Sequence, residues 1–112
     1  MYLSFVETAA FTRRVERLEL ENELRSLQLE LLAHPEAGRL DPDTGGLRKI
    51  RVGSSARGKG KRGGARMHYL YIPHRHRIYL IFVYGKNDND TLTPAQKSQL
   101  RNVVEAIKRE TQ

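Results

Sequence analysis

Apolar residues recur at helical spacing in two stretches of the first third of the chain. Behind Thr8, whose side chain can cap a helix start, one stripe takes positions i, i+4 and i+7: Phe11, Val15 and Leu18. A second stripe predicts a helix from about Leu20 to Ala33, ended by His34–Pro35: Leu20, Leu24, Leu27 and Leu31. Because no glycine or proline separates the stripes, one long helix and a hairpin of two helices both fit the pattern.

The last part of the chain carries the clearest helix signal. Thr93 suits the N-cap, Pro94 the first helical position and Gln96 the third, so that Thr93 and Gln96 form a capping box. The apolar residues that follow form one stripe, which we expect to be buried: Leu100, Val103, Val104 and Ile107.

Short apolar or alternating runs predict four strands: Tyr2–Val6, Leu47–Val52, Arg66–Ile72 and Arg77–Tyr84. The last two form a hairpin around a turn at Pro73–His76, and the last strand is apolar on both faces, as a central strand is. The stretch Glu36–Gly46, rich in proline and glycine, is predicted to be a loop.

The predicted order is β-α-α-β-β-β-α, an α+β fold in which a small, mostly antiparallel sheet packs against helices. A chain of 112 residues has room for one modest core, so we expect a single domain over residues 1–112.

The charge is divided unevenly along this framework. The formal net charge is +7, yet residues 44–87 hold eleven Lys or Arg and no Asp or Glu. Such a field predicts a polyanionic partner: nucleic acid, the ribosome or an acidic membrane face. The chain has no cysteine, no signal-peptide pattern in Met1–Phe11 and no apolar stretch of membrane-spanning length, so we expect a cytoplasmic protein without a membrane partner.

Between the second and third predicted strands lies a loop in which glycines alternate with cations: Arg57, Lys59, Lys61 and Arg62, followed by Arg66. Glycine lets a backbone approach a phosphate closely, so this loop is a candidate phosphate contact. Gly53–Lys59 reads G-x-x-x-x-G-K, but Gly60 stands where a P-loop needs Ser or Thr, and a strand follows where a helix should. Nucleotide hydrolysis is therefore rejected.

The strands on either side of the loop carry further cations. Lys49 and Arg51 share one strand face, as do Arg66 and His68, so adjacent strands would bring all four to one side of a groove. For His68, a hydrogen-bonded and partly buried structural role competes with catalysis. The basic region has no acidic cluster, and the H-x-H turn at His74 lacks a third ligand, so no metal or other cofactor is predicted.

Four segments together resemble the HigB-type branch of the RelE/ParE toxin superfamily: GLRKIRV (46–52), GKGKRGGAR (58–66), IYLIFVYGKND (78–88) and the last helix with its T-x-x-Q cap. The resemblance implies a RelE-like, microbial RNase-like fold. It also implies a toxin that acts as an endoribonuclease on messenger RNA in the ribosomal A site. Such a toxin is paired with a HigA-like helix-turn-helix antitoxin.

By this resemblance, Lys49 and Arg51 match the basic strand pair of these toxins, Arg66 matches a phosphate-clamping arginine, and Lys86 a basic position after the last strand. Two residues depart from the pattern. Asn87 stands where RelE has a key arginine, and Thr93 stands near the position of its catalytic tyrosine. We expect RNA contacts from five residues: Lys49, Arg51, Arg57, Arg62 and Tyr84. We expect the chemistry among five others: Lys59, Lys61, Arg66, His68 and Lys86. The general acid and base stay unassigned among four candidates: Lys59, Lys61, His68 and Tyr84.

The predicted reaction is attack of an RNA 2′-hydroxyl on the adjacent phosphate, without a metal ion. Lysines crowded by other cations lose protons more easily and can act as bases, while arginine stabilises the charge that builds on the phosphorane. Two other readings stay open: a non-catalytic, ParE-like poison of DNA gyrase, and a plain RNA- or ribosome-binding module.

Overall fold

The structure is a computed structural model, and it describes residues 3–53, 64–85 and 91–112. Along the chain its elements are β1 (Ser4–Glu7), α1 (Ala9–Leu18), α2 (Glu21–Ala33), β2 (Arg39–Leu40), β3 (Arg48–Val52), β4 (Ala65–Ile72), a 3-10 turn (Pro73–Arg75), β5 (Arg77–Gly85) and α3 (Pro94–Glu110). Among these described residues, no helix is long and apolar enough to cross a lipid bilayer.

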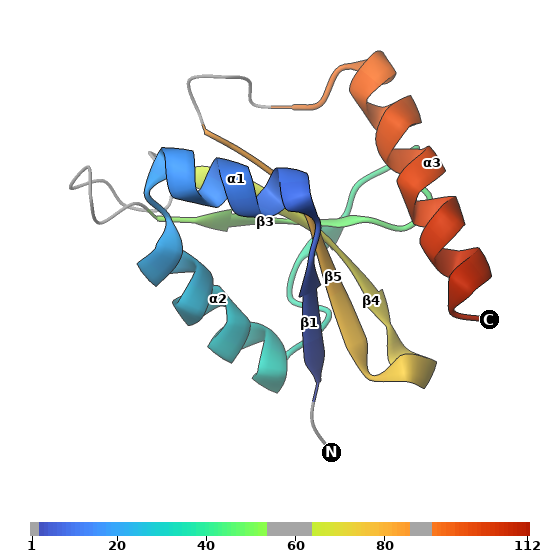
Figure 1. The fold of residues 1–112 in the computed structure, drawn as a ribbon, viewed down its shortest axis with the longest axis horizontal. Coiled ribbons are helices and arrows are strands. Elements are labelled where there is room, and N and C mark those ends of the chain that lie inside the picture. Colours follow the sequence, from blue (N-terminus) through green and yellow to red (C-terminus); the bar gives the residue numbers. More distant parts are fainter. Residues whose placement is uncertain (1–2, 54–63, 86–90) are drawn as a thin grey trace.

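The strands form one mixed sheet in the order β1-β5-β4-β3-β2 (Figure 1). Only β1 runs parallel to its neighbour β5, and the other pairs are antiparallel, so the sheet is mostly antiparallel as predicted. The prediction missed β2, because two residues inside a loop sequence show no alternation. The first strand also begins two residues later than expected, at Ser4.

The first helical region is a hairpin of two helices. Glu19 adopts a left-handed conformation (φ 56°) and the Leu20 backbone N–H bonds back to the Val15 carbonyl at 3.0 Å. Burial of Leu20 accompanies this turn, as an apolar contact commonly does at a helix C-terminus. A glutamate takes the position where glycine is usual, which is why the sequence left the break undecided.

Helices α1 and α2 cover one face of the sheet, and α3 covers the other (Figure 1). Side chains alternate along β4, so Met67 and Tyr69 join the core under α1 and α2, whereas Leu70 and Ile72 join the core under α3. In α3 the predicted stripe is correct for Val104 and Ile107, which are buried, and for half-buried Leu100. It is wrong for Val103, which lies beside the stripe and is 38% exposed.

Tyr69 fastens the connection between α2 and β2 to this core. Its hydroxyl donates to the Pro35 carbonyl and accepts from the Gly38 N–H, both at 2.8 Å. A Cβ on Gly38 would lie 2.8 Å from the Tyr69 ring, so a glycine is needed for this approach. Burial raises the pKa of Tyr69, which keeps the hydroxyl a proton donor.

Candidate nucleic-acid interface

The strand register lines up side chains from four strands on one face of the sheet. Arg39 pairs with Lys49, Lys49 with His68, and His68 with Phe82, so these four residues form one row across the sheet. A second row runs beside it: Arg51, Arg66 and Tyr84. The expectation that Lys49, Arg51, Arg66 and His68 meet on one face is therefore confirmed, whereas their chemical roles stay predictions.

This face has an accessible part and a buried part. Arg39 and Arg51 are exposed and Lys49 is half-buried. In contrast, Arg66 and Tyr84 are only 4% and 3% exposed. The accessible cations thus lie towards β2 and β3, and they lead to a buried arginine and tyrosine on β4 and β5.

A β-bulge shapes the inner end of the two rows. The register between β4 and β5 shifts after His68, so that Ile81 is the extra residue on β5. Ile81 and Phe82 consequently both face α3, where they pack against its core. Phe82 in turn lies 6.0 Å from the Tyr84 ring, and the Tyr84 ring stacks on His68 at 5.8 Å.

His68 is fully buried and is held by an acid that the sequence placed outside the basic region. Its Nε2 lies 2.8 Å from Oδ2 of Asp41, and Oδ1 of Asp41 lies 3.3 Å from Nζ of Lys97 on α3. Because a carboxylate only accepts hydrogen bonds, the neutral imidazole carries its proton on Nε2 and donates it to Asp41.

Electrostatics keep this imidazole neutral. Burial lowers the pKa of His68, against the opposing effect of Asp41, and the positive charges of Lys49 and Lys97 lower it further. Burial alone would raise the pKa of Asp41, but the hydrogen bonds from His68 and Lys97 and the positive charge of Lys97 outweigh it and lower that pKa. This arrangement fits a structural role for His68, whose imidazole is buried and hydrogen-bonded to Asp41.

The cations of α3 that face the β2–β3 connection bind its backbone. Lys97 donates to the Pro42 carbonyl at 3.0 Å, Arg101 to the Asp43 carbonyl at 2.9 Å, and Lys108 to the Gly45 carbonyl at 2.7 Å. These three side chains hold the segment that carries Asp41. They therefore have a structural role in addition to adding positive charge.

The glycine-rich loop begins and ends at the edge of the second row. Val52 pairs with Ala65, and Ala65 with Gly85, so the two chain segments that leave the sheet here start beside Arg51, Arg66 and Tyr84. A Cβ on Gly64 would lie 1.8 Å from the Val52 carbonyl oxygen, so a glycine is required there. The predicted site residues on these segments lie outside the described residues: Arg57, Lys59, Lys61, Arg62 and Lys86, together with the departure at Asn87.

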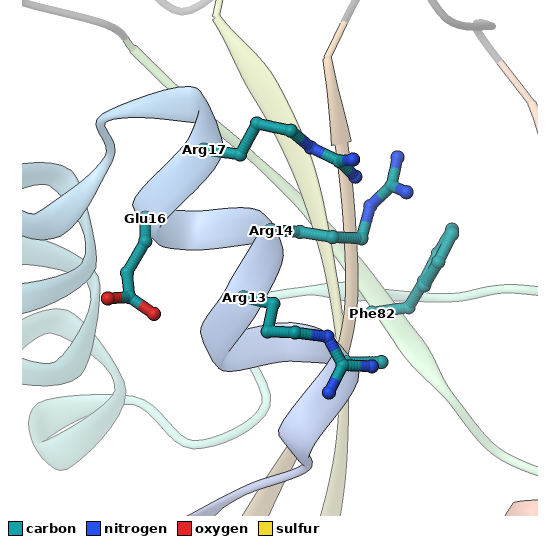
Figure 2. A pocket seen from close by; sticks show the side chains of 6 residues that line it. Arg13, Arg14, Glu16, Arg17 and Phe82 are labelled. Atoms are coloured by element: carbon teal, nitrogen blue, oxygen red, sulfur yellow. The ribbon is translucent and has the colours of Figure 1, made fainter.

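Sequence reasoning missed three arginines of α1: Arg13, Arg14 and Arg17. Figure 2 shows them reaching towards the side of β5 that carries Phe82, whereas Glu16 points away. Nε of Arg14 donates to the Val83 carbonyl at 2.5 Å, and its guanidinium carbon lies 4.9 Å from the centre of the Phe82 ring. The i, i+4 spacing of Arg13 and Arg17 was a visible signal, but the net negative charge of the N-terminal third concealed it.

Arg14 occupies a place that the sheet leaves open. Strand β1 pairs with β5 only as far as Leu80, so the outer edge of β5 beyond it needs other hydrogen-bond partners. The Thr8 hydroxyl donates to the Ile81 carbonyl at 2.9 Å and Arg14 donates to the Val83 carbonyl. The N-cap of α1 and an arginine in the middle of this helix therefore complete the edge of β5 beside the candidate interface.

The histidines of the β4–β5 turn do not form a metal site with other described residues. Nε2 of His74 lies 2.5 Å from the Thr111 carbonyl, where Arg75 also donates, so the turn fastens the end of α3. Within residues 3–53, 64–85 and 91–112, no three or more His, Asp or Glu side chains gather as a metal-binding group.

No family model matches the sequence. Among solved structures, the fold resembles two of the E. coli toxin RelE. A double arginine-to-alanine mutant in the free state aligns with a TM-score of 0.58 at 19% identity, over 80% of this chain and 90% of that one. The isolated toxin aligns with a TM-score of 0.54 at 20% identity, over 97% and 98%. The predicted RelE-like α+β fold is therefore confirmed.

Proposed function

We propose that this protein is the toxin of a type II toxin–antitoxin system and that it cleaves messenger RNA on the ribosome. Two solved structures with a similar fold are both of a toxin, RelE. The observation that carries the proposal is the pair of side-chain rows on one face of the sheet, in which exposed Arg51 and half-buried Lys49 lead to buried Arg66.

In this proposal the accessible cations bind the RNA backbone and Arg66 acts on the reacting phosphate. Lys49 and Arg51 neutralise phosphates on the strand that crosses β3. Arg66 is 4% exposed, so a phosphate that reaches it leaves bulk water and experiences a stronger electrostatic stabilisation. Tyr84 contacts the RNA beside it.

The proposed reaction needs no metal ion. The 2′-oxygen forms a bond to phosphorus, the 5′-oxygen of the next nucleotide leaves, and the product is a 2′,3′-cyclic phosphate. A base takes the 2′-hydroxyl proton while an acid protonates the leaving oxygen. The candidates for these two tasks remain Lys59, Lys61 and Tyr84, whereas the Asp41 hydrogen bond argues for His68 in a positioning role.

The finer assignment follows the sequence resemblance. We propose a HigB-type toxin that works in the A site, without a cofactor, in the cytoplasm. Its proposed partner is a HigA-like helix-turn-helix antitoxin. Against the basic face of this toxin we expect an acidic or amphipathic antitoxin segment, because charge complementarity speeds association.

Induction of the chain in a bacterial host, followed by mapping of new messenger RNA 5′ ends, tests the proposal. The wild type should arrest growth and generate new ends within translated codons. Lys49→Ala/Arg51→Ala should lose this effect, whereas Arg25→Ala/Arg109→Ala, which removes the same charge from exposed positions elsewhere, should retain it. Growth arrest without new ends would contradict an endoribonuclease.

A ParE-like gyrase poison is the second candidate. It is favoured by the burial of His68 against Asp41, because this removes a standard acid–base group from the accessible part of the face. Supercoiling assays with purified gyrase separate the two candidates: a poison inhibits supercoiling at concentrations that leave translation in an extract intact.

A further inference from the structure

A cleft of about 520 Å³ lies between α1 and β5, at the end of the first row of the interface (Figure 2). The charged residues that line it all come from α1. They are three cations, Arg13, Arg14 and Arg17, and one acid, Glu16, whose side chain points away from the β5 side (Figure 2). Arg13 and Arg17 are exposed, and neither forms an ion pair or side-chain hydrogen bond with another described residue. Like charges at i and i+4 destabilise a helix slightly, so an anion between them would be favourable.

The wall of this cleft is preorganised. Arg14 is fixed by the Val83 carbonyl on one side and by the Phe82 ring on the other. Phe82 belongs to the row that continues through His68 to Lys49. The cleft therefore lies at the β5 end of this row, and the accessible cations Arg39 and Lys49 lie at its other end.

We infer that the cleft is a second RNA subsite, in which Arg13 and Arg17 bind backbone phosphates of the strand that lies on the basic face. The inference rests on the proposed function. It extends the RNA-binding surface to α1, which lies in the N-terminal third of the chain, where acids outnumber Lys and Arg. Arginine suits this task because its planar guanidinium presents several donors to phosphate oxygens. Side chains at i and i+4 also lie close enough to bind neighbouring phosphates.

A membrane surface would offer phosphates too, but α1 does not suit it. Helices that lie on membranes expose an apolar face beside their cations. The large apolar residues of α1 pack against the core and are not free to insert: Phe11 and Val15 are 0% and 3% exposed, and Leu18 is half-buried. RNA, which needs cations and no exposed apolar face, fits the cleft better.

The test measures binding of a short fluorescent single-stranded RNA to purified protein across a range of salt concentrations. Each phosphate that the protein no longer neutralises should lower the log–log salt slope by about 0.7, so Arg13→Ala/Arg17→Ala should lower it by about 1.4 and weaken binding about tenfold. Arg25→Ala/Arg109→Ala is the matched control, because it also removes one mid-helix arginine and one arginine from a last turn. Arg13→Lys/Arg17→Lys should restore the slope, since the slope counts charges.

An equal fall in slope for the cleft variant and its control would overturn the subsite, because the effect would then be one of net charge. An unchanged slope would overturn it as well. So would equally tight, equally arginine-dependent binding to phosphatidylglycerol vesicles or to poly-glutamate, which would indicate a membrane or an acidic protein segment. Circular dichroism and thermal unfolding establish that each variant is folded.

The same variants separate this inference from the proposed function. In ribosome-dependent cleavage, Arg13→Ala/Arg17→Ala should raise the protein concentration for half-maximal rate and leave the saturating rate unchanged. A wild-type protein that cleaves messenger RNA, with a cleft variant of unchanged concentration dependence, refutes the subsite alone. A wild-type protein that produces no cleavage at all refutes the proposed function.

Discussion

The hydrogen bond between His68 and Asp41 permits an experiment that distinguishes a structural histidine from a catalytic one. Nε2 of His68 lies 2.8 Å from the carboxylate, and the side-chain amide nitrogen of a glutamine can reach nearly the same place. His68→Gln therefore keeps a donor for Asp41 but cannot take up or release a proton in the working pH range. His68→Ala removes both the donor and the ring.

The structure sets the expected magnitudes. A hydrogen bond to a charged group contributes about 1.5–3 kcal/mol, and truncating a fully buried ring adds a cavity cost of about 2 kcal/mol, so His68→Ala should lower the free energy of unfolding by about 4 kcal/mol. At about 4 °C per kcal/mol, the Tm should fall by about 15 °C. His68→Gln should stay within about 1 kcal/mol of the wild type.

The pH dependence provides a second measurement. Burial lowers the pKa of His68 in the folded state below the 6.5 of an ordinary histidine. Above pH 6.5 both states hold a neutral ring; as the pH falls below it, only the unfolded state takes up the proton, so stability is lost at up to about 1.4 kcal/mol per pH unit. The lowered pKa of Asp41 adds a further loss only below about pH 3.8.

Urea unfolding at pH 7.5 and 5.5, combined with the cleavage assay at pH 7.5, checks the reasoning. His68→Gln should flatten the loss of stability between these pH values, and exposed His34→Gln should not. A folded His68→Gln protein that cleaves a hundredfold more slowly than the wild type would make His68 an acid or base. An unchanged pH profile would refute the argument from burial.

Three further predictions concern other parts of the chain. Tyr69→Phe should cost about 2–3 kcal/mol in urea unfolding, because two buried backbone groups lose their partner; Tyr71→Phe, whose hydroxyl bonds to no described residue, should cost less than about 0.5 kcal/mol. Replacing Lys59, Lys61 and Arg62 together with alanine should abolish growth arrest with little change in Tm, and a folded variant that still arrests growth would contradict the role assigned to this loop. Ribosome binding should weaken steeply with salt in sedimentation assays; a log–log slope near zero would contradict a polyanionic partner.

Local signals were sufficient for most of the fold. The capping box at Thr93 and Gln96 forms as predicted, and so does the cap at Thr8. Such signals work because a cap and an apolar stripe depend on residues within one or two turns. The turn at Glu19 and strand β2 escaped prediction, since tertiary packing and pairing with β3 stabilise them against weak local preferences.

The candidate site depended more on contacts between distant residues. Alternation placed Lys49 with Arg51 and Arg66 with His68, and the register of β3 and β4 brings the two pairs together. No sequence spacing connects Asp41 with His68, because their contact requires α3 to hold the intervening loop. A catalytic role for His68 would need these contacts to open.

The distribution of charge along the chain proved a poor guide to the charge that a partner can reach. Residues 88–112 hold four acids and four Lys or Arg, but two of these cations, Lys97 and Lys108, are engaged with loop carbonyls. Residues 1–43 hold nine acids against five Lys or Arg, yet they present Arg13 and Arg17 to solvent. A polyanion responds to the cations that it can approach, since those displace its condensed counterions. The interface should therefore extend from β3 in the basic middle third to α1 in the N-terminal third, whose formal charges sum to a negative value. A fragment cut from the basic middle third should then bind RNA more weakly than the whole chain does.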